Sequence, residues 1–190
     1  LKNLIIQNNK NLKIIEFSNV PKLSKLEIID NIDIISLDVS GMLRLTDLNI
    51  YSNISLANLN ITNLPLLNQL NIINNPSLTK LDFSGIISSN IQSLWISGND
   101  GLQILDISGL TSLINVRIAF NLNLESINLT GLILLSDLSI SGNDKLESFE
   151  LIDLSSLSKL TIDNNEGLKT FYLNNLTSLY QLMIINNENL

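Results

Sequence analysis

Acidic side chains recur at one position of a repeated pattern, and they are the first candidates for a catalytic or metal-binding role. That position holds Glu16, Asp38, Asn60, Asp82, Asp106, Asn128, Glu150 and Tyr172. If the repeated segments stack as neighbouring strands, these side chains stand about 4.8 Å apart. Carboxyl groups about 5–5.5 Å apart serve retaining glycosidases, but catalysis also needs a dry pocket that separates two pKa values. An open, repeated face offers no such pocket, so we predict that the protein is not an enzyme.

Calcium is the sharper hypothesis for the same residues, since neighbouring carboxylates and hydroxyls are oxygen ligands for a hard cation. Asp82, Ser84, Asp106 and Ser108 are the nearest such group. Ca²⁺ requires six to eight oxygens, however, and local bonds from these side chains to the backbone explain the same residues more simply. The chain also has no His and no Cys. We therefore predict no cofactor and no metal, with Asp82 and Asp106 as weak candidates.

Large side chains interrupt the pattern at a second set of positions. These are Tyr51, Ile73, Trp95, Arg117 and Phe120, on four consecutive repeats. Trp, Tyr and Arg often anchor interfaces, and exposed apolar clusters tend to mark contact sites. The alternative is that these side chains only pack on one another across neighbouring strands. We interpret them as candidate binding residues, with cross-strand packing left open.

The elements that must position these residues come from a repeat that runs through the whole chain. Its period is 22 residues, apart from one step of 24, and the stretch from Leu67 to Ile86 is representative. Each repeat has a Leu and an Ile separated by one residue, as in Leu70 and Ile72. This spacing of two places both side chains on one face of a strand. A fixed period in this range predicts a solenoid.

An Asn occupies the same position of every repeat. The nine residues are Asn9, Asn31, Asn53, Asn75, Asn99, Asn121, Asn143, Asn165 and Asn187. A buried amide costs about 1–3 kcal/mol if it is unpaired, but its donors and acceptor can satisfy backbone groups at the corners of its own coil and the next. We predict that this asparagine column is structural.

A second half-repeat begins three residues after each Asn, with Gly41, Gly85, Gly109 and Gly131 at one corner. Each coil therefore contains two extended segments. Stacked coils would form a mainly β, parallel β-solenoid of about 8.5 coils with two parallel sheets and little or no helix. Parallel connections favour a right-handed coil. Residues 1–190 then make one domain.

The combined pattern is LxxLxIxxN followed by LxxLDxSGL, as in IQSLWISGNDGLQILDISGL from Ile91 to Leu110. Over the whole chain it resembles the leucine-rich repeat superfamily, in particular internalin-type bacterial surface proteins and the receptor L-domain group. The extended corner of L-domain repeats appears once, in the 24-residue step through Ser88, Ser89 and Asn90. The resemblance implies an extracellular or cell-surface module for adhesion.

The composition limits the classes of partner that the chain is expected to bind. The net charge of −7, from 11 basic and 18 acidic residues, argues against nucleic acid. Without an apolar run of about 18 residues, no membrane insertion is expected in this segment. Both ends lack a polar cap, so we expect a fragment of a longer solenoid. The expected partner is a protein or glycan on another cell or matrix, or a copy of the chain. The alternative function is a structural spacer or a self-assembling filament or surface-layer subunit.

Overall fold

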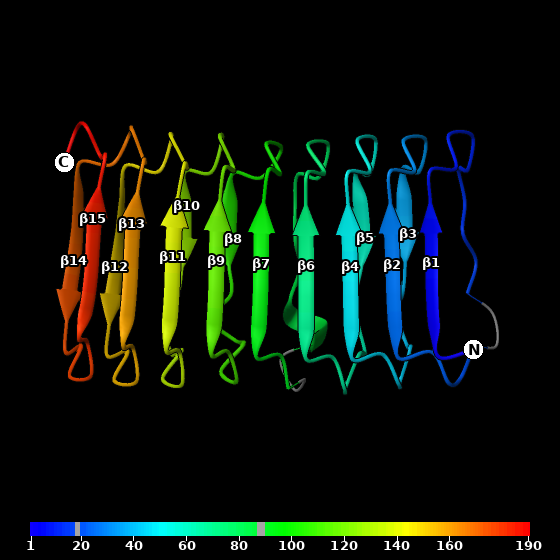
Figure 1. Cartoon of the computed structure of the whole chain (residues 1–190), viewed down its shortest axis with the longest axis horizontal. Coiled ribbons are helices and arrows are strands. Elements are labelled where there is room, and N and C mark those ends of the chain that lie inside the picture. Colours follow the sequence, from blue (N-terminus) through cyan, green and yellow to red (C-terminus); the bar gives the residue numbers. More distant parts are fainter. Residues whose placement is uncertain (18–19, 87–89) are drawn as a thin grey trace.

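The structure is a computed structural model of the chain, and it describes residues 1–17, 20–86 and 90–190. Ser88 and Ser89, which belong to the predicted extended corner, lie outside the described residues. The described chain winds into a parallel β-solenoid (Figure 1), so the predicted mainly β fold is confirmed. Its helical content is a single 3-10 turn, η1 (Ser84–Ile86), within the described ranges. None of the helical structure described is long and apolar enough to cross a membrane.

One face of the solenoid is a continuous nine-stranded parallel sheet. In order across the sheet, its strands are β1 (Asn3–Gln7), β2 (Lys25–Ile29), β4 (Asp47–Tyr51), β6 (Gln69–Ile73), β7 (Ser93–Ser97), β9 (Asn115–Ala119), β11 (Asp137–Ser141), β13 (Lys159–Asp163) and β15 (Gln181–Ile185). Residues 22 apart pair with each other, as Leu48 does with Leu70. The 24-residue step keeps this register, since Leu70 pairs with Leu94.

The second face is discontinuous. It consists of three two-stranded sheets: β3 (Ser36–Asp38) with β5 (Asn58–Asn60), β8 (Ile104–Asp106) with β10 (Ser126–Asn128), and β12 (Ser148–Ile152) with β14 (Thr170–Asn174). The coil that contains η1 has no strand among its described residues on this face. Asp82 therefore precedes a 3-10 turn, whereas Asp106 ends β8.

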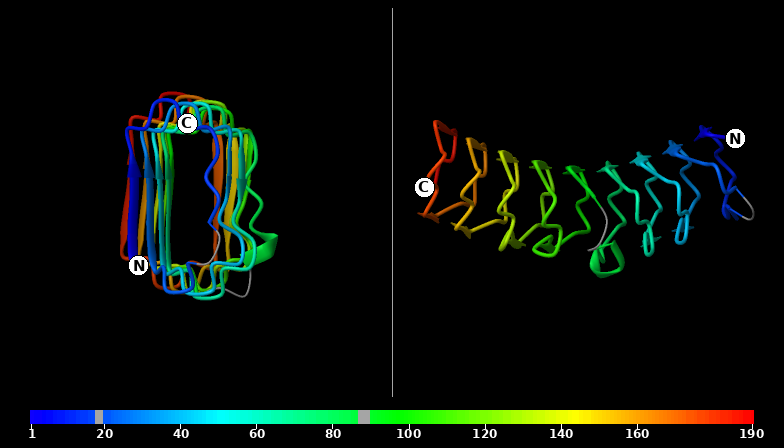
Figure 2. Two further views of the ribbon diagram at one scale, coloured as in Figure 1. Left: turned by 90° about the vertical axis from the view of Figure 1, so that its right-hand side faces the viewer. Right: turned by 90° about the horizontal axis from the view of Figure 1, so that it is seen from below.

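The coil is right-handed and gently curved. In Figure 1 the front strands run upward, the rear strands run downward, and successive coils are added from right to left, which confirms the predicted hand. Figure 2 shows that the nine-stranded sheet lines the concave side of the curve, while η1 lies on the opposite side. Side chains that project outward from the nine-stranded sheet therefore converge slightly.

Rows of identical side chains fill the interior. Leu26, Leu48 and Leu70 stack in one row, with Ile28, Ile50 and Ile72 beside them, and all six are fully buried. Branching at Cβ suits Ile to these pleated positions. Because equivalent residues meet across each pair of coils, the core is the same slab repeated along the rod.

Buried asparagines of the column form hydrogen bonds along the rod. Asn53 donates from Nδ2 to the carbonyl of Tyr51 in its own coil (3.0 Å) and to that of Ile28 in the preceding coil (2.9 Å). Its Oδ1 accepts the main-chain N–H of Asn31 (3.1 Å). This side chain thus joins its own coil to the preceding one: it supplies the acceptor for the N–H of Asn31 and adds a second bond to the Tyr51 carbonyl, which also accepts the N–H of Asp30.

The residue before each column Asn has a positive φ, a regularity that the sequence interpretation did not anticipate. These residues are Asn8, Asp30, Ser52, Asn74, Gly98, Phe120, Gly142, Asn164 and Asn186. Asn, Asp and Gly accept this left-handed conformation readily, whereas a bulky side chain does so at a cost. Phe120, with φ of 53°, is therefore the unusual member of the set.

Candidate binding surface on the concave sheet

Three of the five predicted binding residues project from the concave sheet near its middle. Trp95 and Arg117 are the central residues of β7 and β9 and pair in register, and Tyr51 ends β4. Each follows directly after a buried Ile, Leu or Val in its strand, so the alternation of side chains directs all three away from the core. The repeat thus places them on one surface.

The Arg117 guanidinium lies over the Trp95 ring, with its central carbon 4.9 Å from the ring centroid. This distance is within the range of a cation–π contact, which contributes about 0.5–1 kcal/mol at exposed sites. Trp95 is 36% exposed, and Arg117 is exposed and forms no ion pair with any described residue. The guanidinium covers one face of the indole, so a partner can reach the exposed remainder of the ring and a cation that has no ion-pair partner among the described residues.

A small hydrogen-bonded network lies on the other side of Trp95. Asn71 donates from Nδ2 to Oδ1 of Asn49 (2.7 Å), and the Tyr51 hydroxyl donates to the same oxygen (3.3 Å). Both amides point outward from the sheet, yet Asn49 is only 7% exposed and Asn71 only 6%. Burial raises the pKa of Tyr51, so its hydroxyl stays protonated at neutral pH.

These groups surround a shallow hollow of about 470 Å³. Its lining consists of Tyr51, Gln69, Asn71, Ser93, Leu94, Trp95, Asn115, Val116, Arg117, Asp137 and Ser139. Leu94 and Val116 are buried in the core, so they contribute main chain rather than side chain to the hollow. The surface offered to a ligand is therefore aromatic and polar, with little aliphatic area.

The other two predicted binding residues lie outside this hollow. Ile73 pairs with Tyr51 on the neighbouring strand and is half-buried, and Phe120 is 53% exposed at the corner beyond β9. Phe120 lies against Gly142 of the next coil, where an added Cβ would overlap its ring. The sequence interpretation also missed Asn71, Asn115 and Asp137, because outward Asn and Asp are unremarkable in a chain so rich in them.

The acidic positions of the second face are engaged in local turns. Asp82 accepts hydrogen bonds from the main-chain N–H (3.0 Å) and the hydroxyl (2.7 Å) of Ser84, and these bonds lower its pKa. Asp106 accepts the N–H of Ser108 (3.1 Å), which likewise lowers its pKa. In the described ranges no three His, Cys, Asp or Glu side chains gather as a metal site would require. The geometry is that of corner caps.

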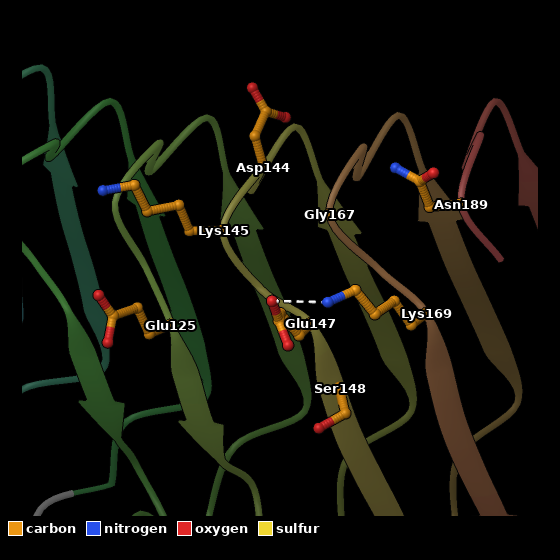
Figure 3. Close-up of a pocket in the computed structure, with 8 residues that line it drawn as sticks. All are labelled: Glu125, Asp144, Lys145, Glu147, Ser148, Gly167, Lys169 and Asn189. Carbon is orange, nitrogen blue, oxygen red and sulfur yellow. Dashed lines mark ion pairs between the residues drawn. The ribbon is translucent and has the colours of Figure 1, made fainter.

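A second hollow, where the last coils enter the second face, gathers charges of both signs (Figure 3). Lys169 and Glu147 form an ion pair of 2.8 Å, with 60% and 67% of their side chains exposed. In Figure 3, Lys145, Glu125 and Asp144 point away from that pair rather than toward a common point. Exposed pairs of this kind contribute little, and this hollow is an ordinary solvated surface.

Comparison with known proteins gives no assignment. The chain matches no protein-family model, and no curated protein is significantly similar to it.

Proposed function

We propose that the chain is a non-enzymatic interaction module that binds its partner through the concave sheet. The observation that carries this proposal is the Trp95–Arg117 pair beside the Tyr51 network, around a hollow in an otherwise repetitive surface. Repeat proteins use their concave surfaces for binding, and Trp, Tyr and Arg are enriched among the few residues that dominate the energy of an interface. The chemistry of the lining suits a protein or glycan surface.

We further propose that the module is a leucine-rich-repeat protein that works in adhesion at a cell surface. The repeat pattern supports this family, and the regular spacing of Leu, Ile and Asn along the rod agrees with it. The cell-surface setting follows from the resemblance alone.

Binding of the tetramerised chain to cells and to extracellular matrix tests the proposal. The double variant Trp95→Ala/Tyr51→Ala should lose binding, because it removes both aromatic faces of the hollow. A matched control is Lys159→Ala/Thr161→Ala, two outward residues of β13 on the same sheet but outside the hollow. Circular dichroism would confirm that both variants are folded.

The result decides between the functions. Binding that is retained by the double variant would contradict the proposed surface. No binding to any cell or matrix, together with concentration-dependent self-association in sedimentation, would favour the spacer or filament instead. Loss in the double variant and retention in the control would support the module.

A further inference from the structure

The hollow on the concave sheet has a lining that is unusual in its chemistry. Its side chains are two aromatic rings, three carboxamides, two Ser hydroxyls, one guanidinium and one carboxylate. Apart from Tyr51, the ionisable groups among these described residues are Arg117 and Asp137, whose charges cancel. The hollow therefore has no net charge, and it presents no aliphatic side chain that could pack against an apolar group of a ligand.

Asn71 gives the second observation. Asn71 is only 6% exposed. Its Nδ2 donates to Oδ1 of Asn49, but its own Oδ1 receives no hydrogen bond from any described residue. Buried polar atoms are nearly always paired, and an unpaired one costs about 1–3 kcal/mol. Because Asn71 lines the hollow, a ligand that brings a hydrogen-bond donor there would satisfy this oxygen.

Carboxamides, a guanidinium and a carboxylate together suit a ligand with many hydroxyl groups. A hydroxyl donates and accepts at once, as do the side chains of Asn and Gln, while Arg and Asp supply pairs of donors or acceptors to adjacent hydroxyls. The negative face of an indole attracts the C–H edge of a saturated ring. Trp95 with Asn71, Asn115 and Asp137 supplies both kinds of contact.

Other ligand classes fit less well. A peptide strand would need an open sheet edge, but β6, β7 and β9 each have a strand paired on both sides. An apolar helix would need an aliphatic groove. A strongly anionic ligand fits poorly, because the negative charge of Asp137 offsets the positive charge of Arg117 in the hollow. The volume of about 470 Å³ is within the range of about 300–1,000 Å³ typical of small-ligand sites.

We propose that this hollow binds a neutral pyranose residue of a glycan, with the sugar ring on Trp95 and its hydroxyls on Asn71, Asn115, Asp137 and Arg117. The inference rests on the proposed function and names the ligand class for the same surface. The glycan is held by side chains alone, so the scaffold need not move to bind it.

Trp95 is the only Trp in the chain, so its fluorescence reports directly on the hollow. The full chain would be titrated with the methyl glycosides of glucose, galactose, mannose and N-acetylglucosamine and with their short oligomers, and it would be applied to a printed array of neutral and acidic glycans. We expect a saturable change in Trp95 emission with at least one neutral saccharide. Asn115→Ala should weaken that binding at least about tenfold, because Asn115 is exposed and its loss removes a contact without disturbing the core.

Asn71→Leu tests the buried oxygen and should also weaken binding at least about tenfold, provided that circular dichroism shows a folded chain. Thr161→Ala on β13 is the matched control and should bind as the unmodified chain does. If Asn71→Leu fails to fold, Asn115→Ala decides the question alone. Unchanged affinity in Asn115→Ala would overturn the inference.

The outcomes also separate this inference from the proposed function. Cell binding that survives periodate oxidation of surface glycans, with no saccharide response in Trp95 emission, would overturn the glycan and leave the interaction module intact. Binding only to acidic saccharides would overturn a neutral ligand. Absence of both saccharide and cell binding would overturn both proposals.

Discussion

The main-chain N–H of Asn99 donates to Oδ1 of Asn121 in the following coil, at 3.1 Å. Asn121 in turn donates from Nδ2 to the carbonyl of Ile96 (3.2 Å), and its own N–H is accepted by Asn143 (3.1 Å). One side chain therefore satisfies a donor and an acceptor of the preceding coil at once. The solenoid is held together at this corner by side chains, in addition to its strand ladder.

Replacing a column Asn with Leu should destabilise the rod. Asn53→Leu leaves the N–H of Asn31 without its acceptor and removes the side-chain bonds to the carbonyls of Ile28 and Tyr51, the second of which still accepts the N–H of Asp30. An unpaired buried group costs about 1–3 kcal/mol, so we expect a loss of about 2 kcal/mol in the free energy of unfolding. Thermal unfolding followed by circular dichroism should show a midpoint lower by roughly 4–8 °C, at about 2–4 °C per kcal/mol for a chain of this size.

Asn121→Leu should also lower the midpoint clearly, for the same reason. Asn58→Leu is the matched control, because Asn58 is exposed on β5. Hydrogen exchange provides a local check, since the N–H of Asn31 should exchange faster in Asn53→Leu. An unchanged midpoint in both column variants would show that the amides do not support the fold.

Gly167→Ala should destabilise the chain for a steric reason. A Cβ at this position would overlap the carbonyl oxygen of Asp144 in the preceding coil, and main chain cannot rotate away as a side chain can. Overpacking of this kind costs about 1–3 kcal/mol, which chemical denaturation would measure. Gly41→Asn is the control, because its neighbourhood is open, its φ of 71° suits Asn, and Asn63 occupies the same corner one coil later. Equal losses in the two variants would contradict the steric explanation.

Phe120→Asn should stabilise the chain. Phe120 adopts φ of 53°, which costs a non-Gly residue roughly 1–2 kcal/mol, whereas Asn is present at the same corner position in residues 8, 74, 164 and 186. We expect a gain of about 1 kcal/mol in chemical denaturation. The reverse change, Asn74→Phe, should destabilise. A loss of stability in Phe120→Asn would mean that packing of the ring on Gly142 outweighs the backbone strain.

The carboxyl groups of the second face should make stability depend on acid pH. Bonds from Ser84 hold the pKa of Asp82 below its ordinary value in the folded chain, led by the Ser84 hydroxyl. A lowered folded-state pKa stabilises the fold above the unfolded pKa of about 3.9, and this contribution is lost as the pH falls through the folded pKa. Stability should therefore decline below about pH 4.

Titration of the carboxyl carbons by NMR would test this assignment. Ser84→Ala should raise the pKa of Asp82 toward its ordinary value, because it removes the leading hydrogen bond. Ser108→Ala should raise the pKa of Asp106 less, since there the main-chain N–H of Ser108 is the leading cause and survives the substitution. Equal shifts in both variants would contradict the assignment.

The repeat in the sequence was sufficient to predict the fold. Alternation of Leu and Ile around one outward residue places the strands, and the period of 22 determines which residues stack, as the pairing of Leu48 with Leu70 shows. The asparagine column was predictable for the same reason, because an amide at an inward position of every coil must find backbone partners. Because the same local pattern recurs in every coil, few other folds are compatible with the sequence.

Only the tertiary structure shows how the side chains at the variable positions of the repeat are placed relative to one another. Register places Ile73 beside Tyr51 and outside the hollow, and Phe120 lies at the left-handed corner against Gly142 of the next coil. Asn71 looks like any outward Asn in the sequence, yet its pairing with Asn49 across the strands buries it at the hollow. These outcomes depend on contacts between residues 22 to 24 positions apart and on the curvature of the sheet, which no single repeat contains.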